Sequence, residues 1–265
     1  MMVVAVTLHQ HTIKHFLNGF KGMDDLVISI GQIGISAAGT MDKAYFVSRW
    51  FQYRNEEECH TAGDIALGQL STFAALVEEC GNGGELVKIS LDDKGVLRVV
   101  GNAQDFKMPT IQTATSQAGV SVIQKQISLS ADTEYKTFGN ENIPFDFSMS
   151  FMASDFSALQ TTGKSIQNGA LFCLSVESDN TLNLGVQRDS IRMNAKLEPE
   201  PPHTVLNDTV MWFGKWLMDA LRAMPKTGVI HLHGGNNTPL LMIHELDGIM
   251  STTAIIAPRQ EESGE

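Results

Sequence analysis

Residues 70–99, LSTFAALVEECGNGGELVKISLDDKGVLRV, are the most informative part of this chain about its fold. Its first part has apolar residues at Leu70, Phe73 and Val77, which is the spacing of one face of an amphipathic helix. Its second part has alternating apolar residues on both sides of the turn at 93–95, as in a β-hairpin. The stretch therefore predicts one helix followed by one hairpin.

The same helix-and-hairpin unit occurs four times along the 265 residues. The other three copies begin at Ile13, Phe156 and Phe213 and continue into apolar alternating segments at 26–35, 171–184 and 229–243. Repetition on this scale indicates a repeated architecture. The four units form two pairs, so the sequence predicts an α+β fold of two similar domains, each with two helices packed on antiparallel strands.

A segment rich in Ser, Thr and Gln lies between the two pairs, from about 112 to 142. We expect an N-terminal domain at 1–118, an interdomain connector at 119–144, and a C-terminal domain at 145–265 that ends in an acidic tail. Four apolar residues alternate with polar ones in the connector: Val120, Val122, Ile123 and Ile127. The connector could therefore equally be an additional edge strand.

Composition indicates a protein with two modest hydrophobic cores, because 43% of the residues are hydrophobic and no apolar stretch reaches about 18 residues. The apolar start of the chain is short and lacks the basic flank of a signal peptide, so we expect an intracellular protein. Cys59, Cys80 and Cys173 are widely spaced, which favours free thiols over a disulfide framework or a zinc site.

The net charge of −11 argues against nucleic-acid binding, because phosphate contacts need local positive potential. The distribution of charge points the other way. Acidic residues concentrate in loops and in the C-terminal tail, whereas the predicted helices or the residues just beyond them carry the bases Lys14, Lys21, Lys164, Lys215, Arg222 and Lys226. The alternative interpretation is that these are ordinary solvated helix faces.

The sequence contains no convincing catalytic motif. His11 and His15 are four residues apart on a predicted helix, but no nearby carboxylate completes a metal site. His231 and His233 share one face of a predicted strand, where a surface role is favoured over catalysis. No Gly-x-Ser-x-Gly nucleophile elbow is present. We expect no catalytic residue, no bound metal and no cofactor, and therefore a protein that is not an enzyme.

Four segments resemble a known family: residues 65–82 with the two strands that follow, 40–47, 237–241 and 255–259 before the acidic tail. They are similar to segments of DNA sliding clamps of the proliferating-cell-nuclear-antigen (PCNA) and phage polymerase clamp type. The order of helices and hairpins also matches along almost the whole chain. The resemblance implies the DNA-clamp fold, in which six domains close a ring around DNA, so that two-domain chains assemble as a homotrimer.

The function implied by the resemblance is that of a DNA polymerase processivity factor. Such a clamp encircles duplex DNA without sequence preference, is placed there by a clamp loader, and tethers polymerase and other replication and repair proteins. The DNA-facing residues would be Lys14, Lys21, Lys164, Lys215, Arg222 and Lys226. One departure is that the second helix carries no Lys or Arg and ends in Glu78-Glu79. The protein would be intracellular and associated with DNA.

Partners of this family bind through short peptide motifs in a groove beside the connector. Carried over by position, the groove residues here are Met41, Phe46, Ile143, Pro144, Pro239, Ile255 and Pro258. The aromatic pair that the family has before Ala-Pro is replaced by Ala254-Ile255-Ile256, which changes the shape of that pocket. The alternative is that these residues are simply core and turn positions.

Two other functions stay open at this point. The chain could be a clamp-fold interaction scaffold, or one subunit of a mixed ring, that does not encircle DNA by itself; the acidic second helix favours this alternative slightly. It could also be an enzyme on an unrelated α+β fold. The sequence does not indicate whether the host is viral, archaeal or eukaryotic.

Overall fold

The computed structural model describes residues 2–42, 44–81, 85–102, 104–111, 117–159, 170–177, 179–188 and 191–259. The chain divides into two compact units. Unit 1 comprises Met1–Met41, Val47–Val120 and Gly248–Ser251, and unit 2 comprises Asp42–Phe46, Ser121–Asp247 and Thr252–Glu265.

Unit 1 is built from β1 (Met2–His9), α1 (Gln10–Leu17), the 3-10 turn η1 (Asn18–Phe20), β2 (Leu26–Ile30), β3 (Gly34–Met41), most of β4 (Tyr45–Gln52), β5 (Glu58–Thr61), β6 (Gly63–Leu67), α2 (Leu70–Glu79), β7 (Leu86–Asp92), β8 (Val96–Val100) and β9 (Asp105–Pro109). Its strands follow the orders β5-β1-β7-β8-β9 and β6-β2-β3-β4. The pairs β1·β7, β7·β8, β8·β9 and β2·β3 are antiparallel.

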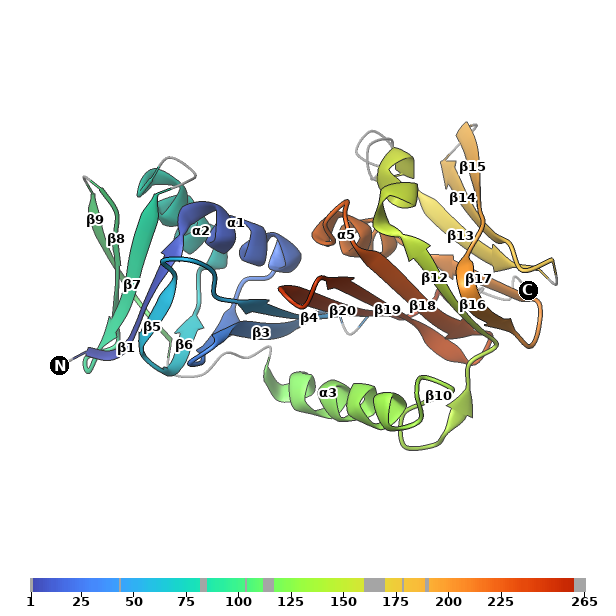
Figure 1. Ribbon diagram of the computed structural model, residues 1–265, viewed down its shortest axis with the longest axis horizontal. Coiled ribbons are helices and arrows are strands. Elements are labelled where there is room, and N and C mark those ends of the chain that lie inside the picture. The colour runs from blue at the N-terminus through green and yellow to red at the C-terminus, as the bar shows by residue number, and fades with distance from the viewer. Residues whose placement is uncertain are drawn as a thin grey trace. The chain divides into compact units, whose positions relative to one another are not determined.

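Residues 70–99 form the helix and hairpin that their sequence predicts: α2 is followed by the β7–β8 hairpin. Asp92 Oδ1 accepts hydrogen bonds from the amides of Lys94 and Val96, both 2.9 Å long, and Gly95 adopts a φ of 76°. Helices α1 and α2 lie side by side over the strands of unit 1 (Figure 1). Phe16 and Phe73, one from each helix, are fully buried in this layer.

Unit 2 is built from most of α3 (Gln117–Asp132), β10 (Thr137–Phe138), β11 (Ile143–Pro144), β12 (Phe147–Met152), the 3-10 turn η2 (Ala153–Phe156), β13 (Leu171–Val176), β14 (Leu182–Arg188), β15 (Ile191–Leu197), β16 (Glu200–Val205), β17 (Thr209–Phe213), α5 (Trp216–Ala223), β18 (Val229–Gly235), β19 (Thr238–Leu246) and most of β20 (Met250–Ile256). Its strands follow the orders β16-β12-β18-β19-β20 and β15-β14-β13-β17.

The two units repeat one strand order. The series β5-β1-β7-β8-β9 in unit 1 corresponds to β16-β12-β18-β19-β20 in unit 2, and β6-β2-β3-β4 corresponds to β17-β13-β14-β15. Corresponding strands also come at the same points of the chain order: β6 precedes α2, just as β17 precedes α5. The prediction of two domains with the same architecture, each made of helices on antiparallel strands, is confirmed.

The connector contains the helix α3, so the alternative of an edge strand is wrong. Val120 is buried, Ile123 and Ile127 are half-buried, and Val122 is 59% exposed. Residues 120 and 122 would share a face in a strand, whereas 120, 123 and 127 share a face in a helix. Figure 1 shows α3 and α5 on opposite sides of the β12–β18–β19 sheet of unit 2. None of the helices in the described part of the chain has the length and apolar character needed to span a bilayer.

Candidate functional site

Two of the predicted DNA-facing bases lie on the helix layer of unit 1. Lys14 is exposed on α1, and its Nζ lies 2.6 Å from Glu78 Oε1 of α2. Lys21 follows η1, is exposed, and has no ion pair among the described residues. Both lysines border a groove of about 480 Å³ between α1 and α2, whose floor includes Leu17 and Ala74. The small side chains of α2 leave this groove open.

Lys215 precedes α5 in unit 2 and is held on an aromatic face. Its Nζ lies 4.1 Å from the centre of the Trp216 ring, and Trp216 in turn stacks on Tyr45 with ring centres 5.6 Å apart. A cation–π contact of this kind leaves the outer side of the ammonium group available to solvent or to a phosphate.

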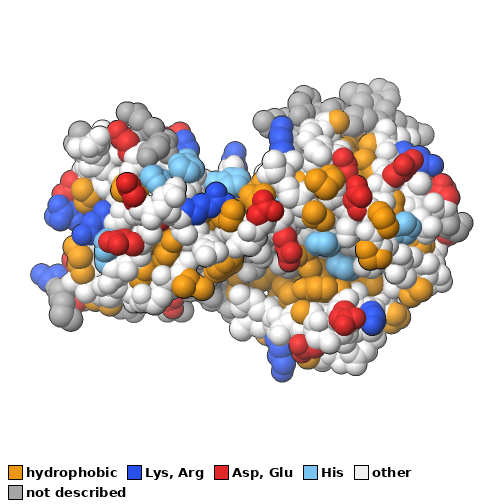
Figure 2. Space-filling view, in the orientation of Figure 1, with side chains coloured by type: hydrophobic (Ala, Val, Ile, Leu, Met, Phe, Trp, Pro, Cys, Tyr) orange, Lys and Arg blue, Asp and Glu red, His pale blue; other side chains and the backbone are white. Residues whose placement is uncertain are grey.

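Arg222 lies in the last turn of α5 and is only 20% exposed. Its Nη1 is 3.8 Å from Asp219 Oδ1, while its Nε and Nη2 are buried without a hydrogen-bond partner in the described structure. Lys226, just beyond the helix, is exposed. Lys164 lies outside the described residues. Figure 2 shows one face of the molecule, on which Lys and Arg side chains are scattered among Asp and Glu.

The predicted groove residues differ widely in exposure. Phe46 and Ile255 are almost fully buried and belong to the core of unit 2. Four others in unit 2 are half-buried or exposed, and these are Ile143, Pro144, Pro239 and Pro258. Met41 is half-buried at the end of β3 in unit 1. Of the predicted groove residues in unit 2, these four are therefore accessible at the surface of the single chain.

Sequence reasoning missed an aromatic cluster at the end of α3. The ring of His233 on β18 stacks on Tyr135 at 4.9 Å and lies 5.6 Å from the ring of Phe145, and its Nδ1 is 2.9 Å from Ser148 Oγ. His233 is only 6% exposed, so the expected surface role is wrong for it. Burial, with a smaller effect of His231, lowers the pKa of His233 to about 4 and keeps the ring neutral. The aromatic residues in and beside the connector were the sequence feature that could have indicated this cluster.

Comparison with known proteins gives a match in structure but not in sequence. No protein-family model and no curated relative matches the chain. The structure of A. fulgidus PCNA with the C-terminal region of FEN-1 bound superposes with a TM-score of 0.73, covering 98% of this chain and 100% of that one at 12% identity. PCNA from Thermococcus kodakaraensis gives a TM-score of 0.69, covering 97% and 100% at 14% identity.

The chain has the fold of a PCNA-type sliding clamp. In this clamp fold, β9 and β15 are the last strands of their sheets among the described residues, so each presents an unpaired backbone edge. Cys59, Cys80 and Cys173 are free thiols, and burial raises the pKa of each. No group of three potential metal ligands occurs in the described part of the chain.

Proposed function

We propose that this protein is a DNA polymerase processivity factor, a non-enzymatic sliding clamp whose copies close a homotrimeric ring around duplex DNA. The clamp fold over 98% of the chain supports this proposal. The observation that carries it is that β9 in unit 1 and β15 in unit 2 each end a sheet, whereas the strands to which they correspond in the repeat are paired.

The internal repeat shows which edges fit each other. Strands β4 and β20 meet through backbone hydrogen bonds at their ends, from Gln52 N to Ile249 O within unit 1 and from Ala257 N to Ala44 O within unit 2, both 2.8 Å long. In the repeat, β4 corresponds to β15 and β20 corresponds to β9. By the same geometry, β9 of one copy would pair with β15 of the next. Such head-to-tail contacts generate a closed ring when the rotation from one copy to the next closes, which we propose for three copies of this chain.

The helices would line the ring and contact the DNA backbone. The proposed contacts are Lys14, Lys21, Lys164, Lys215, Arg222 and Lys226, with the exposed Lys21 and Lys226 foremost. Contacts to phosphate position a protein on DNA without reading bases, so the ring could slide. The residues responsible for the net charge of −11 would lie mainly on other faces.

Partners would bind as short peptides beside the connector. A structural neighbour, A. fulgidus PCNA, has the C-terminal region of FEN-1 bound. We propose that polymerase and other replication and repair proteins use the accessible groove residues Ile143, Pro144, Pro239 and Pro258 of this chain, and that a clamp loader opens the ring. No cofactor or metal is needed for this function, which would be carried out on DNA inside the cell.

A topological experiment tests encirclement without a loader. Fluorescently labelled protein is mixed with linear duplex that carries biotin at both ends, streptavidin is added, and unbound protein is washed away at moderate salt. We expect retention only when both ends are blocked, and release when a restriction enzyme cuts between them. Retention that does not depend on the ends would contradict encirclement.

The alternative of a scaffold, or of one subunit in a mixed ring, has one observation in its favour. Helix α2 carries no base, and its Glu78 pairs with Lys14 of α1. A chain of this kind would bind partner peptides but would not be retained by blocked ends when it is the only protein present.

A further inference from the structure

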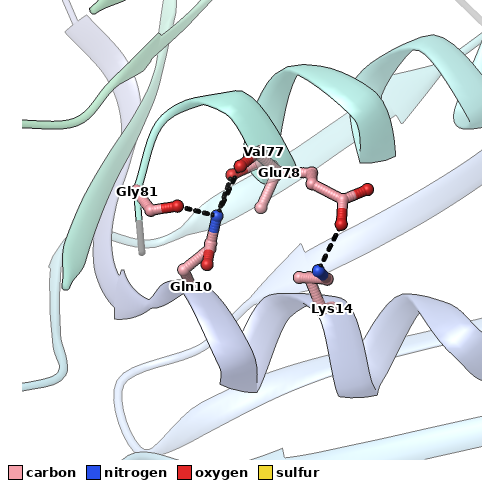
Figure 3. A network of polar contacts seen from close by, with 5 residues as sticks. All are labelled: Gln10, Lys14, Val77, Glu78 and Gly81. Atoms are coloured by element: carbon pink, nitrogen blue, oxygen red, sulfur yellow. Dashed lines mark hydrogen bonds and ion pairs between the residues drawn. The ribbon is translucent and has the colours of Figure 1, made fainter. Parts of the chain in front are cut away.

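One buried side chain fixes how α1 and α2 meet. Gln10, the first residue of α1, is 3% exposed. The two hydrogens of its Nε2 are shared among three carbonyl oxygens, those of Val77 at 2.9 Å, Glu78 at 2.7 Å and Gly81 at 2.6 Å (Figure 3). Val77 and Glu78 belong to the last turn of α2, whose carbonyls lack partners within the helix, and Gly81 follows it, so the Gln10 amide caps the C-terminus of α2 from the neighbouring helix. The cap sets the register of the two helices.

That register places Lys14 against Glu78. Lys14 is one turn after Gln10 on the same face of α1, and its Nζ reaches Glu78 Oε1 at 2.6 Å (Figure 3). Both side chains remain largely accessible, at 46% and 65% exposure. An exposed ion pair of this kind is weak enough to open when another anion approaches.

Negative charge lies on the α2 side of the pair, whereas Lys21, His11 and His15 border the same hollows as Lys14. Glu79 is exposed next to Glu78, and the C-terminus of α2 carries the negative end of the helix dipole. The positive charge of Lys14 is therefore partly neutralised by Glu78, whereas Lys21 has no ion pair among the described residues.

We propose that Glu78 is a brake on DNA association in unit 1. Its carboxylate competes with DNA phosphates for the Lys14 ammonium, so that Lys14 contributes to DNA binding only when the ion pair opens. The inference rests on the proposed function, and it adds a way in which DNA binding is regulated. The consequence for a clamp is a looser hold on the DNA backbone, which favours movement along the duplex over tight binding.

The test measures DNA association of the full-length protein at several salt concentrations by fluorescence anisotropy with a labelled blunt duplex. The variants are Glu78→Gln, Lys14→Gln and the two together. Glu79→Gln is the matched control, because it removes the same charge from the neighbouring exposed position. Circular dichroism and native mass verify that each variant keeps the fold and the oligomeric state of the parent.

We expect Glu78→Gln to bind DNA about two- to fivefold more tightly at low salt, the range that corresponds to an exposed ion pair. Its affinity should also fall more steeply with salt, by about one additional phosphate contact. In the Lys14→Gln background the gain should disappear, and Lys14→Gln alone should change affinity less than Glu78→Gln does.

An equal gain from Glu79→Gln, or a gain from Glu78→Gln that persists without Lys14, would overturn the brake and leave only a general effect of charge. DNA association by the parent with no response to Glu78→Gln would overturn the brake alone. A parent that does not associate with DNA even at low salt would overturn the proposed function together with the brake.

Discussion

The Arg49 side chain caps the C-terminal end of α1. It lies on β4 at 1% exposure, and its Nη1 donates to the carbonyl oxygens of His15 at 2.5 Å and Phe16 at 3.0 Å, at the C-terminal end of α1. A positive charge is favourable at this end of a helix. A Cβ on Gly19 would lie 2.5 Å from Arg49 Cδ, so the buried arginine also requires glycine there.

Replacing Arg49 by Met keeps most of the side-chain volume but removes the donor to both carbonyls. We expect the free energy of unfolding to fall by about 1–3 kcal/mol, the cost of leaving buried polar groups unpaired. Urea denaturation measures it. Arg54→Met is the control, because Arg54 is exposed and its loss should cost less than about 0.5 kcal/mol. Equal free energies of unfolding for Arg49→Met and the parent would contradict the capping role of Arg49.

His233 makes the stability of unit 2 depend on pH. Burial lowers its folded pKa from 6.5 to about 4, so the unfolded chain takes up a proton first as the pH falls. Stability should therefore decrease between pH 6.5 and pH 4, by about 3 kcal/mol for this group. The measurement is urea denaturation of the parent and of His233→Phe across this range. The parent should lose more stability than the variant on acidification, and parallel profiles would contradict the assignment.

Among the secondary-structure elements, the helix-and-hairpin units could be predicted because the spacing of apolar residues within each segment indicates its helix and its hairpin. The sequence 70–99 and its three repeats are examples. The helix α3 was missed because Val120 and Val122 suggest alternation while Val120, Ile123 and Ile127 suggest a helix, and packing decided between them. The Lys14–Glu78 pair could not be predicted, since it joins residues far apart in the chain through the Gln10 cap.

The predicted groove could be derived from the sequence only in part. A pattern of apolar residues does not separate Ile255, which is 8% exposed, from the half-buried Ile143. Ile255→Asp would put an unpaired charge into the core of unit 2 and would disturb folding as well as binding. Ile143 of β11, whose backbone pairs with Phe138 of β10, is the better position for testing a peptide site.

Ile143→Asp should weaken binding of a C-terminal peptide of the host's replicative polymerase by at least about tenfold, as expected for loss of an apolar anchor worth more than about 1.4 kcal/mol. Calorimetric titration measures this. Leu206→Asp is the matched control, because Leu206 is 63% exposed and does not belong to the proposed groove. Equal affinity for both variants and the parent would exclude this hairpin from the peptide site.

For the whole molecule, the repeated strand order is the basis of the assembly proposed above. Of the strands that end a sheet, β9 and β15 are the two whose counterparts in the repeat, β20 and β4, are neighbours within one sheet, and an uncovered edge is a liability unless another chain covers it. Phe106 on β9 is half-buried in the single chain and would become buried in the ring. Phe106→Asp should therefore prevent assembly while circular dichroism shows a folded monomer.

The mass of the native particle in solution is the sharpest test of the proposed three-copy ring. Native mass spectrometry and light scattering of the purified protein should give a particle of three copies of the 28.9-kDa chain, and Phe106→Asp should reduce it to one copy. A parent protein that remains a monomer at concentrations of tens of micromolar, while folded and able to bind partner peptides, would contradict a self-sufficient ring.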